Sequence, residues 1–537
     1  MDFDKTQNLY IEGDNLDVLK CLKETYLHKV KMIYIDPPYN TGNDFVYEDD
    51  FAESTSEYLA NSGQFDEQGQ RLVTNTESNG RFHTDWLNMI YPRLKVARDL
   101  LTDDGVIFIS ISEEEIENMK KVCNEIFGED HFTNSFITRR YDKNLNRQFM
   151  DKGLKSFNIG FEYILAYAKN NFLFNPIFKE ASEERSTLGY WKGFWNDADR
   201  PTMRYDILGF TPETGQWKWS KEVAYEAIEN YKNFVENFSS KMTLEEYWAS
   251  TGKNKKFIRK NPNGKGKNDG VENWIAPADG ILRNTNWTDI LTSKADKSTQ
   301  GLFDFPKNVD LIKTLLMCAT AKDSLILDFF SGSATTAHAV MQLNEEDGGS
   351  RKFIMVQLPE LTDEKSDAYK AGYKNICEIG KERIRRAGQK IKEDNPLTTR
   401  DLDTGFRVLK LDSSNMRDIY YSPSDTSQAD LFSMVDNVKE DRAPEDLLFQ
   451  VMLELGAALD SRIETTDVAG KQIFNVADNY LVACFDKNIS DEVVTAIAKM
   501  QPRYAVLRDT SMCDDSTATN FEQIFKTYSP DTVAKVL

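Results

Sequence analysis

The segment that most constrains the fold is a short apolar run, Lys31–Ile35, and the four residues that follow it. These four are Asp36, Pro37, Pro38 and Tyr39. A run too short for a helix that ends in prolines is typical of a buried strand, because proline cannot donate a hydrogen bond to a neighbouring strand. Each proline also fixes its own φ angle and disfavours the helical region for the residue before it. We therefore expect Asp36 at the carboxyl end of a buried strand, followed by a stiff, extended backbone.

These residue types suit a site that holds a planar ring with an amino group. The Asp36 carboxylate and the Pro37 carbonyl can each accept an N–H bond, and Tyr39 offers an aromatic face for stacking. The exocyclic amine of adenine is a poor nucleophile, since its lone pair is delocalised into the ring, so its methylation requires hydrogen bonds that favour a tetrahedral nitrogen. A base inside a duplex has to be extruded before it reaches such a site. The alternative is that the tetrapeptide forms only a turn after the strand.

A second segment, Ser324–Val340, is typical of a strand, a tight turn and a helix. Gly332 allows the backbone to approach a ligand closely, and Ser333 or Thr335 can cap the helix, whose free N–H groups then face that ligand. This arrangement is typical of a nucleotide-type cofactor loop at the carboxyl end of a strand. The segment lacks the three glycines of the dinucleotide-binding pattern, so alone it does not identify a cofactor.

Together, the two segments resemble the amino-DNA methyltransferases, in which an Asp-x-Phe-x-Gly-Ser loop binds S-adenosylmethionine and Asp-Pro-Pro-Tyr carries the chemistry. Here the loop runs from Asp328 to Ser333, about 290 residues after Tyr39, which is the permuted order of the β class. Further segments are similar to the modification (Mod) subunit of type III restriction-modification systems. These are 8–15, 34–44, 216–220, 287–290 and 514–517.

This resemblance implies a site-specific adenine-N6 methyltransferase that transfers a methyl group from S-adenosylmethionine to a flipped adenine of double-stranded DNA. The catalytic residues it implies are Asp36, Pro37, Pro38 and Tyr39, and no metal is expected, because the sulfonium of the donor is already a good leaving group. The residues expected at the cofactor are Asp14, Asp328, Phe330, Gly332, Ser333, Thr335, Gln357 and Glu360. Gln357 and Glu360 are alternatives for the ribose hydroxyls, and Asp14 lies either near the cofactor's adenine or at a plain helix cap.

The resemblance also implies a homodimer and a restriction (Res) subunit as partner. Two other interpretations stay open. One is an orphan amino-methyltransferase, or a related enzyme that acts on RNA or on a cytosine amine. The other is a chain that serves chiefly as the DNA-recognition subunit of a nuclease. No Gly-x4-Gly-Lys-Ser/Thr phosphate loop occurs in the sequence, so ATP-driven cleavage would need another chain.

The net charge of −21 argues at first sight against a DNA partner, but the charge is unevenly distributed. The net charge is −15 for residues 1–132, +5 for 133–300, 0 for 301–400 and −11 for 401–537. The basic residues expected to contact phosphates are Arg139, Arg140, Lys253, Lys255, Lys256, Arg259 and Lys260. The alternative for 251–268, which is rich in Gly and Asn, is a solvated flexible loop.

The fold expected is α/β, a doubly wound, mostly parallel sheet built from residues 1–170 and 286–400. Residues 171–285 lose the alternation of strand and helix and are rich in aromatic residues, so we expect an inserted target-recognition domain there. Residues 401–537 are expected to form a small α/β domain for assembly or partner docking. Within the core, the polar stretch 43–80 is typical of an insertion or flap.

Local patterns predict several caps and surfaces. Thr84 is expected to begin a helix that is kinked at Pro92, and Ser112 with Glu115 is expected to form a capping box. Three arginines, Arg383, Arg385 and Arg386, are expected either on a solvated helix face or facing a phosphate. Four tryptophans are expected more in the core of the inserted domain than against DNA, namely Trp191, Trp195, Trp217 and Trp219.

The remaining composition places the chain among cytoplasmic proteins. Six cysteines lie far apart without metal-type spacing, which is typical of reduced and mostly buried thiols, and the four histidines form no cluster. No apolar run approaches the roughly 18 residues that a membrane span requires. Met1 is followed by Asp-Phe-Asp, so we expect no signal peptide.

Overall fold

The structure is a computed structural model. It describes all residues except 1, 2, 4, 42–81, 141–156, 158, 279, 295–302, 304, 305, 418–437 and 509–514, and it does not describe the side chains of 515–519. The predicted flap at 43–80 therefore lies outside the described residues. The chain divides into a main unit, Met1–Asn175 with Thr285–Leu537, and an inserted unit, Pro176–Asn284. The assignment of four domains with separate roles stays a prediction.

The main unit is built on a nine-stranded sheet of order β13-β4-β5-β3-β2-β14-β15-β1-β16. Among these described strands, β5 runs antiparallel to its two neighbours and every other pair is parallel. The strands are β1 (Leu9–Glu12), β2 (Val30–Ile35), β3 (Leu101–Ile111), β4 (Phe132–Arg139), β5 (Phe161–Ala168), β13 (Asn286–Leu291), β14 (Leu325–Asp328), β15 (Lys352–Gln357) and β16 (Arg407–Lys410).

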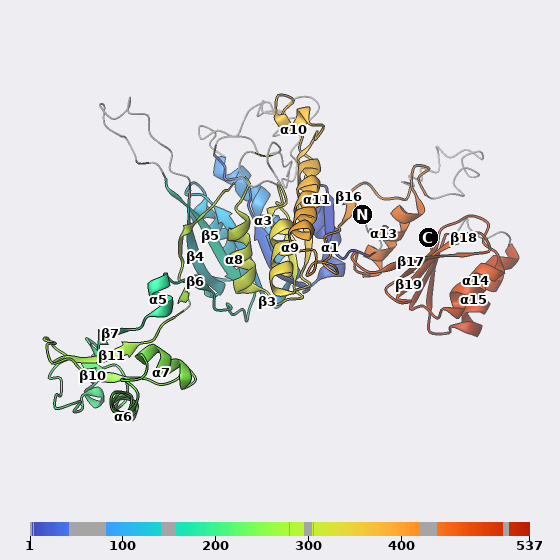
Figure 1. Cartoon of the computed structure of the whole chain (residues 1–537). Helices are drawn as coiled ribbons and strands as arrows, with labels where there is room; N and C mark the ends of the chain where they lie inside the picture. The colour runs from blue at the N-terminus through green and yellow to red at the C-terminus, as the bar shows by residue number, and fades with distance from the viewer. Residues whose placement is uncertain are drawn as a thin grey trace, which may run out of the picture. The chain divides into compact units, whose positions relative to one another are not determined.

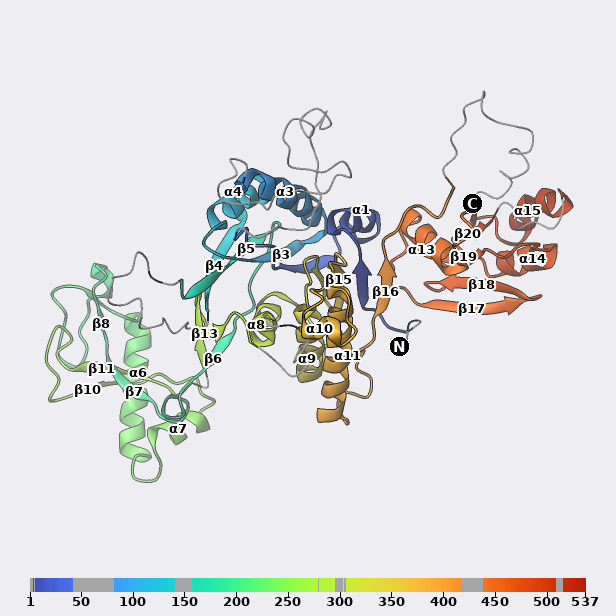
Figure 2. The ribbon, with the colours of Figure 1, turned by 90° about the horizontal axis from the view of Figure 1, so that it is seen from above.

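Helices cover both faces of this sheet (Figure 1 and Figure 2). One face carries α1 (Asn15–Tyr26), α3 (Phe82–Leu100) and α4 (Ile116–Phe127). The other face carries α8 (Val309–Ala319), α9 (Thr335–Asp347) and α11 (Ile376–Asp394), with the short α10 (Asp367–Lys370) nearby. The central strands are buried on both faces, which is why they are continuous apolar runs. The prediction of a doubly wound, mostly parallel α/β fold is confirmed.

Three of the local predictions are wrong. Thr84 lies inside α3, which already begins at Phe82, and Glu115 precedes α4 without a side-chain cap. The Glu115 carboxylate is fully buried, and its hydrogen-bond partners are the side chains around it: Asn40 and His83 at 2.6 Å and Asn118 at 2.8 Å. Arg383 is fully buried rather than on a solvated face.

The C-terminal part of the main unit contains a second sheet of order β17-β18-β19-β20-β21. Its elements are α13 (Pro444–Glu454), β17 (Ile463–Val468), β18 (Lys471–Val476), β19 (Leu481–Cys484), α14 (Asp491–Lys499), β20 (Tyr504–Leu507), α15 (Asp515–Tyr528) and β21 (Val533–Val536). The Tyr26 hydroxyl of α1 donates to Asp460 at 2.8 Å, and Lys352 pairs with the same carboxylate at 3.3 Å. This part is therefore joined to α1 and β15 by polar contacts as well as by apolar packing.

The inserted unit has small sheets and two longer helices, α6 (Lys221–Asn237) and α7 (Leu244–Ser250). Its other elements are β6 (Phe178–Glu180), α5 (Glu183–Thr187), β7 (Tyr190–Gly193), β8 (Trp195–Asn196), β9 (Gln216–Trp217), β10 (Ile258–Lys260), β11 (Val271–Ile275) and β12 (Gly280–Leu282). Trp217 is fully buried, and the other three tryptophans pack as partly buried rings against the unit's two apolar clusters. The prediction that these rings form core is confirmed.

The described cysteines are free thiols. Cys123, Cys318, Cys377 and Cys484 are buried and Cys21 is exposed, while Cys513 lies outside the described residues. None of the helices in the described part of the chain has the length and apolar character that crossing a bilayer requires.

Candidate active site

The two segments singled out in the sequence lie side by side at one edge of the sheet. β2 and β14 are neighbouring parallel strands, with Met32 opposite Ile326 and Ile33 opposite Leu327. Their carboxyl ends therefore reach the same edge, so Asp36 lies close to the loop 329–334 that follows Asp328. The structure brings together the two segments that lie almost 300 residues apart in the sequence.

Asp36 belongs to a cluster of four charged or polar side chains. The Tyr39 hydroxyl lies 2.7 Å from Asp36 Oδ1 and 3.2 Å from Glu162 Oε2. Lys307 Nζ lies 2.9 Å from Glu162 Oε2, 3.2 Å from Asp36 Oδ1 and 2.7 Å from the Tyr39 hydroxyl. These residues come from the ends of β2 and β5 and from the segment before α8. The ammonium of Lys307 thus faces two carboxylates and one phenol.

Burial and these neighbours set the charges of the cluster. Burial raises the pKa of Asp36, while the Lys307 ammonium and the Tyr39 hydrogen bond oppose that rise. Burial and the two carboxylates hold the pKa of Tyr39 well above its ordinary value, so the phenol stays neutral. Burial would lower the pKa of Lys307, but Asp36 and Glu162 raise it above its usual range. The cluster therefore keeps a protonated lysine beside the Asp36 carboxyl.

The backbone after Asp36 is held by α3. The indole nitrogen of Trp86, which is fully buried, donates to the Pro38 carbonyl at 2.8 Å. Asn40 turns the chain with a left-handed φ of 54° and donates to Glu115 at 2.6 Å. The stiff backbone predicted from Pro37 and Pro38 is thus fixed at its far end by side-chain contacts.

The loop after β14 is shaped by Asp328, the last residue of that strand. One oxygen of this buried carboxylate accepts from the Phe330 amide at 3.1 Å, and the other accepts from the Thr336 hydroxyl at 2.5 Å. Gly332 has a φ of 49°, and a methyl group added there would meet no other atom of the described residues within 4 Å, so among these residues the loop borders open space. Its amide donates to the Gln357 side chain at 2.7 Å.

Ser333 and Thr335 do not cap α9, contrary to the prediction. The residue before α9 is Ala334, with a left-handed φ of 60° and no side-chain cap. The hydroxyls of Ser333 and Thr335 instead accept from one nitrogen of Arg383, at 2.9 and 2.5 Å. A fully buried guanidinium needs acceptors, and these hydroxyls supply them. Arg383 therefore ties the start of α9 to α11.

The other residues expected at the cofactor lie around this edge. Asp14 caps α1 by accepting from the amides of Leu16 and Asp17, and Arg93 pairs with it at 3.0 Å. The cap is therefore present, and a cofactor contact of Asp14 stays a prediction. Glu360 has an exposed side chain beyond β15, whereas Gln357 is buried and holds the Gly332 amide. The choice between these two for a ribose contact stays open.

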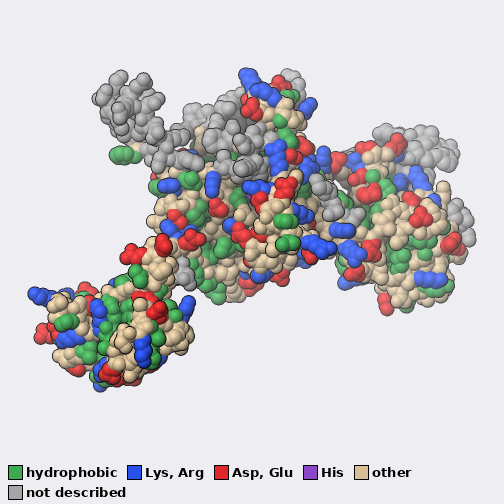
Figure 3. All heavy atoms as spheres, viewed as in Figure 1, with side chains coloured by type: hydrophobic (Ala, Val, Ile, Leu, Met, Phe, Trp, Pro, Cys, Tyr) green, Lys and Arg blue, Asp and Glu red, His purple; other side chains and the backbone are tan. Residues whose placement is uncertain are grey.

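The basic residues predicted for DNA lie in several environments. Arg139 ends β4 with an exposed side chain, while Arg140 pairs with Glu162 at 3.2 Å. In the inserted unit, lysine ammoniums lie near ring centroids: Lys253 near Trp248, Lys255 near Tyr247 and Lys256 near Trp219, at 4.9 to 5.9 Å. The segment 251–268 thus includes β10 and ring-packed lysines, so a fully solvated loop is the wrong description. Figure 3 shows Lys and Arg side chains beside hydrophobic ones on this unit.

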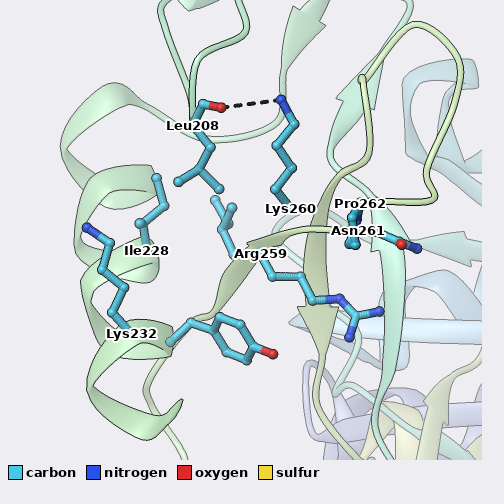
Figure 4. Close-up of a pocket in the computed structure, with 9 residues that line it drawn as sticks. Leu208, Ile228, Lys232, Arg259, Lys260, Asn261 and Pro262 are labelled. Atoms are coloured by element: carbon cyan, nitrogen blue, oxygen red, sulfur yellow. Dashed lines mark hydrogen bonds between the residues drawn. The ribbon is translucent and has the colours of Figure 1, made fainter. Parts of the chain in front are cut away.

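A pocket of about 390 Å³ lies in the inserted unit (Figure 4). It is lined by Leu208, Ile228, Tyr231, Lys232, Ile258, Arg259, Lys260, Asn261 and Pro262. Each of its cations has an acidic partner: Arg259 pairs with Glu272 at 2.9 Å, Lys260 with Asp269 at 2.8 Å and Lys232 with Glu229 at 2.7 Å. The pocket is therefore largely neutralised.

Sequence reasoning missed Glu162, Lys307 and the buried role of Arg383. Glu162 is the one acidic residue of a strand that is otherwise apolar or aromatic, and such an isolated carboxylate is a usable signal. Lys307 follows Phe-Asp-Phe-Pro just before α8, and no local pattern in the sequence links this lysine to Asp36.

Comparison with known proteins gives concordant matches. Residues 30–387 match the family model described as DNA methylase. The chain is 35% identical over 421 residues to the type III restriction-modification enzyme StyLTI Mod subunit of Salmonella typhimurium, covering 75% of this chain and 60% of that protein. It is 33% identical over 453 residues to the EcoPI Mod subunit of Escherichia phage P1, covering 75% and 65%. It is 30% identical over 537 residues to the EcoP15I Mod subunit of Escherichia coli, covering 92% and 78%. The chain thus spans less than two thirds of the length of the first two relatives.

Proposed function

The chain belongs to the DNA methylase family and is similar over most of its length to type III Mod subunits, and from this membership we propose that it is a site-specific DNA methyltransferase. The proposed reaction transfers a methyl group from S-adenosylmethionine to N6 of an adenine flipped out of duplex DNA. The observation that carries the proposal is the adjacency of β2 and β14, which sets Asp36 beside the loop around Gly332.

The proposed role of Asp36, with the Pro37 carbonyl, is to accept the N–H bonds of the target amine. These bonds concentrate electron density in the nitrogen lone pair. The nitrogen then forms its bond to the methyl carbon as the carbon–sulfur bond breaks, and one amine proton passes to the Asp36 carboxylate. The proposed role of Tyr39 is to stack on the base. Its hydroxyl bonds to Asp36 and Glu162 fix the direction of the ring before the base arrives.

The loop after β14 fits the proposed methyl donor. S-adenosylmethionine, when bound, supplies a methyl group on a sulfonium that departs as a neutral thioether. The open space beside Gly332 gives room for a ligand against the backbone, and the first amides of α9 have no side-chain cap that would compete for it. Residues proposed to line this place are Asp14, Asp328, Phe330, Gly332, Ser333, Thr335, Gln357 and Glu360. Of these, Asp328, Ser333 and Thr335 are engaged within the protein, so their proposed role is to shape the loop.

The inserted unit is proposed to carry target recognition. The net positive middle of the sequence includes it, and Lys253, Lys255 and Lys256 lie near aromatic rings, with no ion pair to a carboxylate of the described residues. We also propose, on the names of the relatives, that the chain is the modification and recognition subunit of a type III system, a homodimer that pairs with a Res subunit, and that it acts where the cell's DNA lies, in the cytoplasm.

A product assay tests the proposed function. The purified chain is incubated with genomic DNA and methyl-labelled S-adenosylmethionine, and the nucleosides are separated. We expect label in N6-methyladenine from the wild type and none from Asp36→Ala, while Asp103→Ala, at an exposed position near the start of β3, keeps the activity. Label in N4-methylcytosine would contradict the adenine assignment. Loss of DNA binding by Asp36→Ala would contradict the separation of catalysis from recognition.

A further inference from the structure

The two carboxylate oxygens of Asp36 differ in their hydrogen-bond partners. Oδ1 accepts from the Tyr39 hydroxyl at 2.7 Å and lies 3.2 Å from the Lys307 ammonium. No residue within the described ranges donates a hydrogen bond to Oδ2. The side chain keeps 27% of its surface exposed. One oxygen is thus occupied within the protein, and the other is available at the edge where the target amine is proposed to sit.

Lys307 is itself held in place from the opposite side. Its ammonium lies 2.9 Å from Glu162 Oε2, and the two side chains are only 12% and 8% exposed. Glu162 also binds Arg140 through its other oxygen at 3.2 Å. A buried lysine with two carboxylates and one phenol around it has little freedom to turn away from Asp36. The order of contacts is therefore Arg140, Glu162, Lys307, Asp36.

We propose that Lys307 and Glu162 are positioning residues of the methyl transfer: Glu162 fixes Lys307, and Lys307 with Tyr39 locks Oδ1 of Asp36 as a charged carboxylate, so that Oδ2 accepts the target amine. This inference rests on the proposed function and adds two residues to its machinery. Neither residue needs to touch the base. Their effect passes through the charge and orientation of Asp36.

The charge of Asp36 depends on every ionisable group that faces it. From β2 and its extension these are Tyr34 and Tyr39, from β5 Glu162, from β14 Asp328, and from the segment before α8 Lys307. Of these neighbours, only Lys307 is a cation. Burial and the acidic neighbours disfavour a charged Asp36, so removal of Lys307 leaves that carboxyl protonated to higher pH.

The test compares Lys307→Met and Lys307→Arg with the wild type, in the full chain, by methylation rate on DNA between pH 6 and pH 9. For Lys307→Met we expect kcat at pH 7 to fall at least tenfold and to recover toward pH 9, where more Asp36 is ionised. Lys307→Arg, which keeps the charge, is expected to keep the wild-type pH profile. A matched control is Lys294→Met, whose exposed ammonium pairs with Asp310 outside the cluster. Wild-type kcat and pH profile in Lys307→Met overturn the proposal, as does an equal loss at every pH together with loss of S-adenosylmethionine binding.

A second measurement does not require activity. In Lys307→Met, Asp36 faces Glu162 without the ammonium between them, so burial and Glu162 hold the pKa of Asp36 above its value in the unfolded chain, and stability is lost as pH rises through the raised pKa. We expect the thermal midpoint of Lys307→Met, relative to the wild type, to fall between pH 6 and pH 9, and the added change Glu162→Gln to reduce that fall. If the thermal midpoints of Lys307→Met and the wild type differ by the same amount across this pH range, the proposal that Lys307 keeps Asp36 charged is overturned. If the wild type methylates no DNA, the proposed function is wrong. The pH dependence of the thermal midpoint still decides whether Lys307 keeps Asp36 charged.

Discussion

The Gly332 amide donates a 2.7 Å hydrogen bond to the side-chain oxygen of Gln357, which joins the loop after β14 to the end of β15. Gln357 is buried, and its amide group donates in turn to the Leu358 carbonyl at 3.2 Å. The sequence suggested this residue as one alternative for a ribose contact. That contact stays a prediction, and the observed bond indicates a further task for Gln357, which is to set the position of the loop that borders the proposed donor site.

The change Gln357→Leu tests this task. Leucine keeps the size but offers no acceptor, so the Gly332 amide loses its partner, a loss of about 1–1.5 kcal/mol for a typical hydrogen bond. We expect the affinity for S-adenosylmethionine, measured by calorimetry, to fall about tenfold. Gln389→Leu, on the exposed side of α11, is the matched control and is expected to bind as the wild type does. Equal affinities of the two variants would contradict the role of Gln357.

Two glycines, one near each end of α9, allow the effect of backbone strain on stability to be distinguished from the effect of a side chain on ligand binding. Gly332 and Gly348 have left-handed φ angles of 49° and 65°, and a methyl group at either meets no atom within 4 Å in the part of the chain that the structure describes. Replacement by alanine therefore costs each about 1 kcal/mol of stability through strain alone. We expect similar thermal midpoints for Gly332→Ala and Gly348→Ala, but weaker binding of S-adenosylmethionine only for Gly332→Ala, whose methyl group enters the proposed donor space. Unchanged affinity in Gly332→Ala would show that the ligand does not approach this backbone.

The strands, the sheet edge and the two loops were predictable from the sequence because they depend on local patterns. The apolar run before Asp36 and the run before Asp328 each fill one buried strand, and the carboxyl ends of parallel strands share an edge. Contacts between individual side chains were not predictable, because they depend on residues that are far apart in the sequence. Ser333 follows a capping pattern, yet a buried arginine from α11, 50 residues later, takes its hydroxyl.

The cluster around Asp36 shows the same limit. Glu162 and Lys307 lie 123 and 268 residues from Tyr39 in the chain, and both bind its hydroxyl. Their meeting depends on the order of β5, β3 and β2 in the sheet and on where the chain leaves β13. Neither residue stands in a local pattern that contains Asp36. Long-range ion pairs of this kind become visible only when the strand order is known.

The buried carboxyl of Asp328 predicts a pH dependence of stability. Burial raises its pKa from the ordinary 3.8 to about 7, although bonds from Thr336 and the Phe330 amide oppose the rise. Between these two values the folded chain binds more protons than the unfolded chain, so the free energy of unfolding falls as pH rises from about 4 to about 7 and then levels off. For Asp328→Asn, which cannot ionise, that fall is removed.

The measurement is the thermal midpoint of Asp328→Asn and of the wild type at pH 5, 6, 7 and 8. We expect the wild type to lose stability relative to the variant by an amount on the order of 2 kcal/mol between pH 5 and pH 7. Asp323→Asn, exposed in the turn before β14, is the control and is expected to follow the wild type. Parallel curves for Asp328→Asn and the wild type would mean that Asp328 is ionised throughout this range.

The lysines of the inserted unit predict how DNA binding depends on salt. Lys255 and Lys256 lie 5.7 and 4.9 Å from the ring centroids of Tyr247 and Trp219, and no carboxylate within the described residues pairs with either ammonium. Each is therefore free to neutralise a phosphate, and each such contact contributes about 0.9 to the slope of log affinity against log salt. We expect Lys255→Gln and Lys256→Gln each to lower that slope by roughly this amount between 50 and 200 mM salt, measured by fluorescence anisotropy with a duplex. Lys260→Gln, whose ammonium pairs with Asp269 at 2.8 Å, is expected to change the slope less. An unchanged slope in both of the first two variants would place the DNA elsewhere on the molecule.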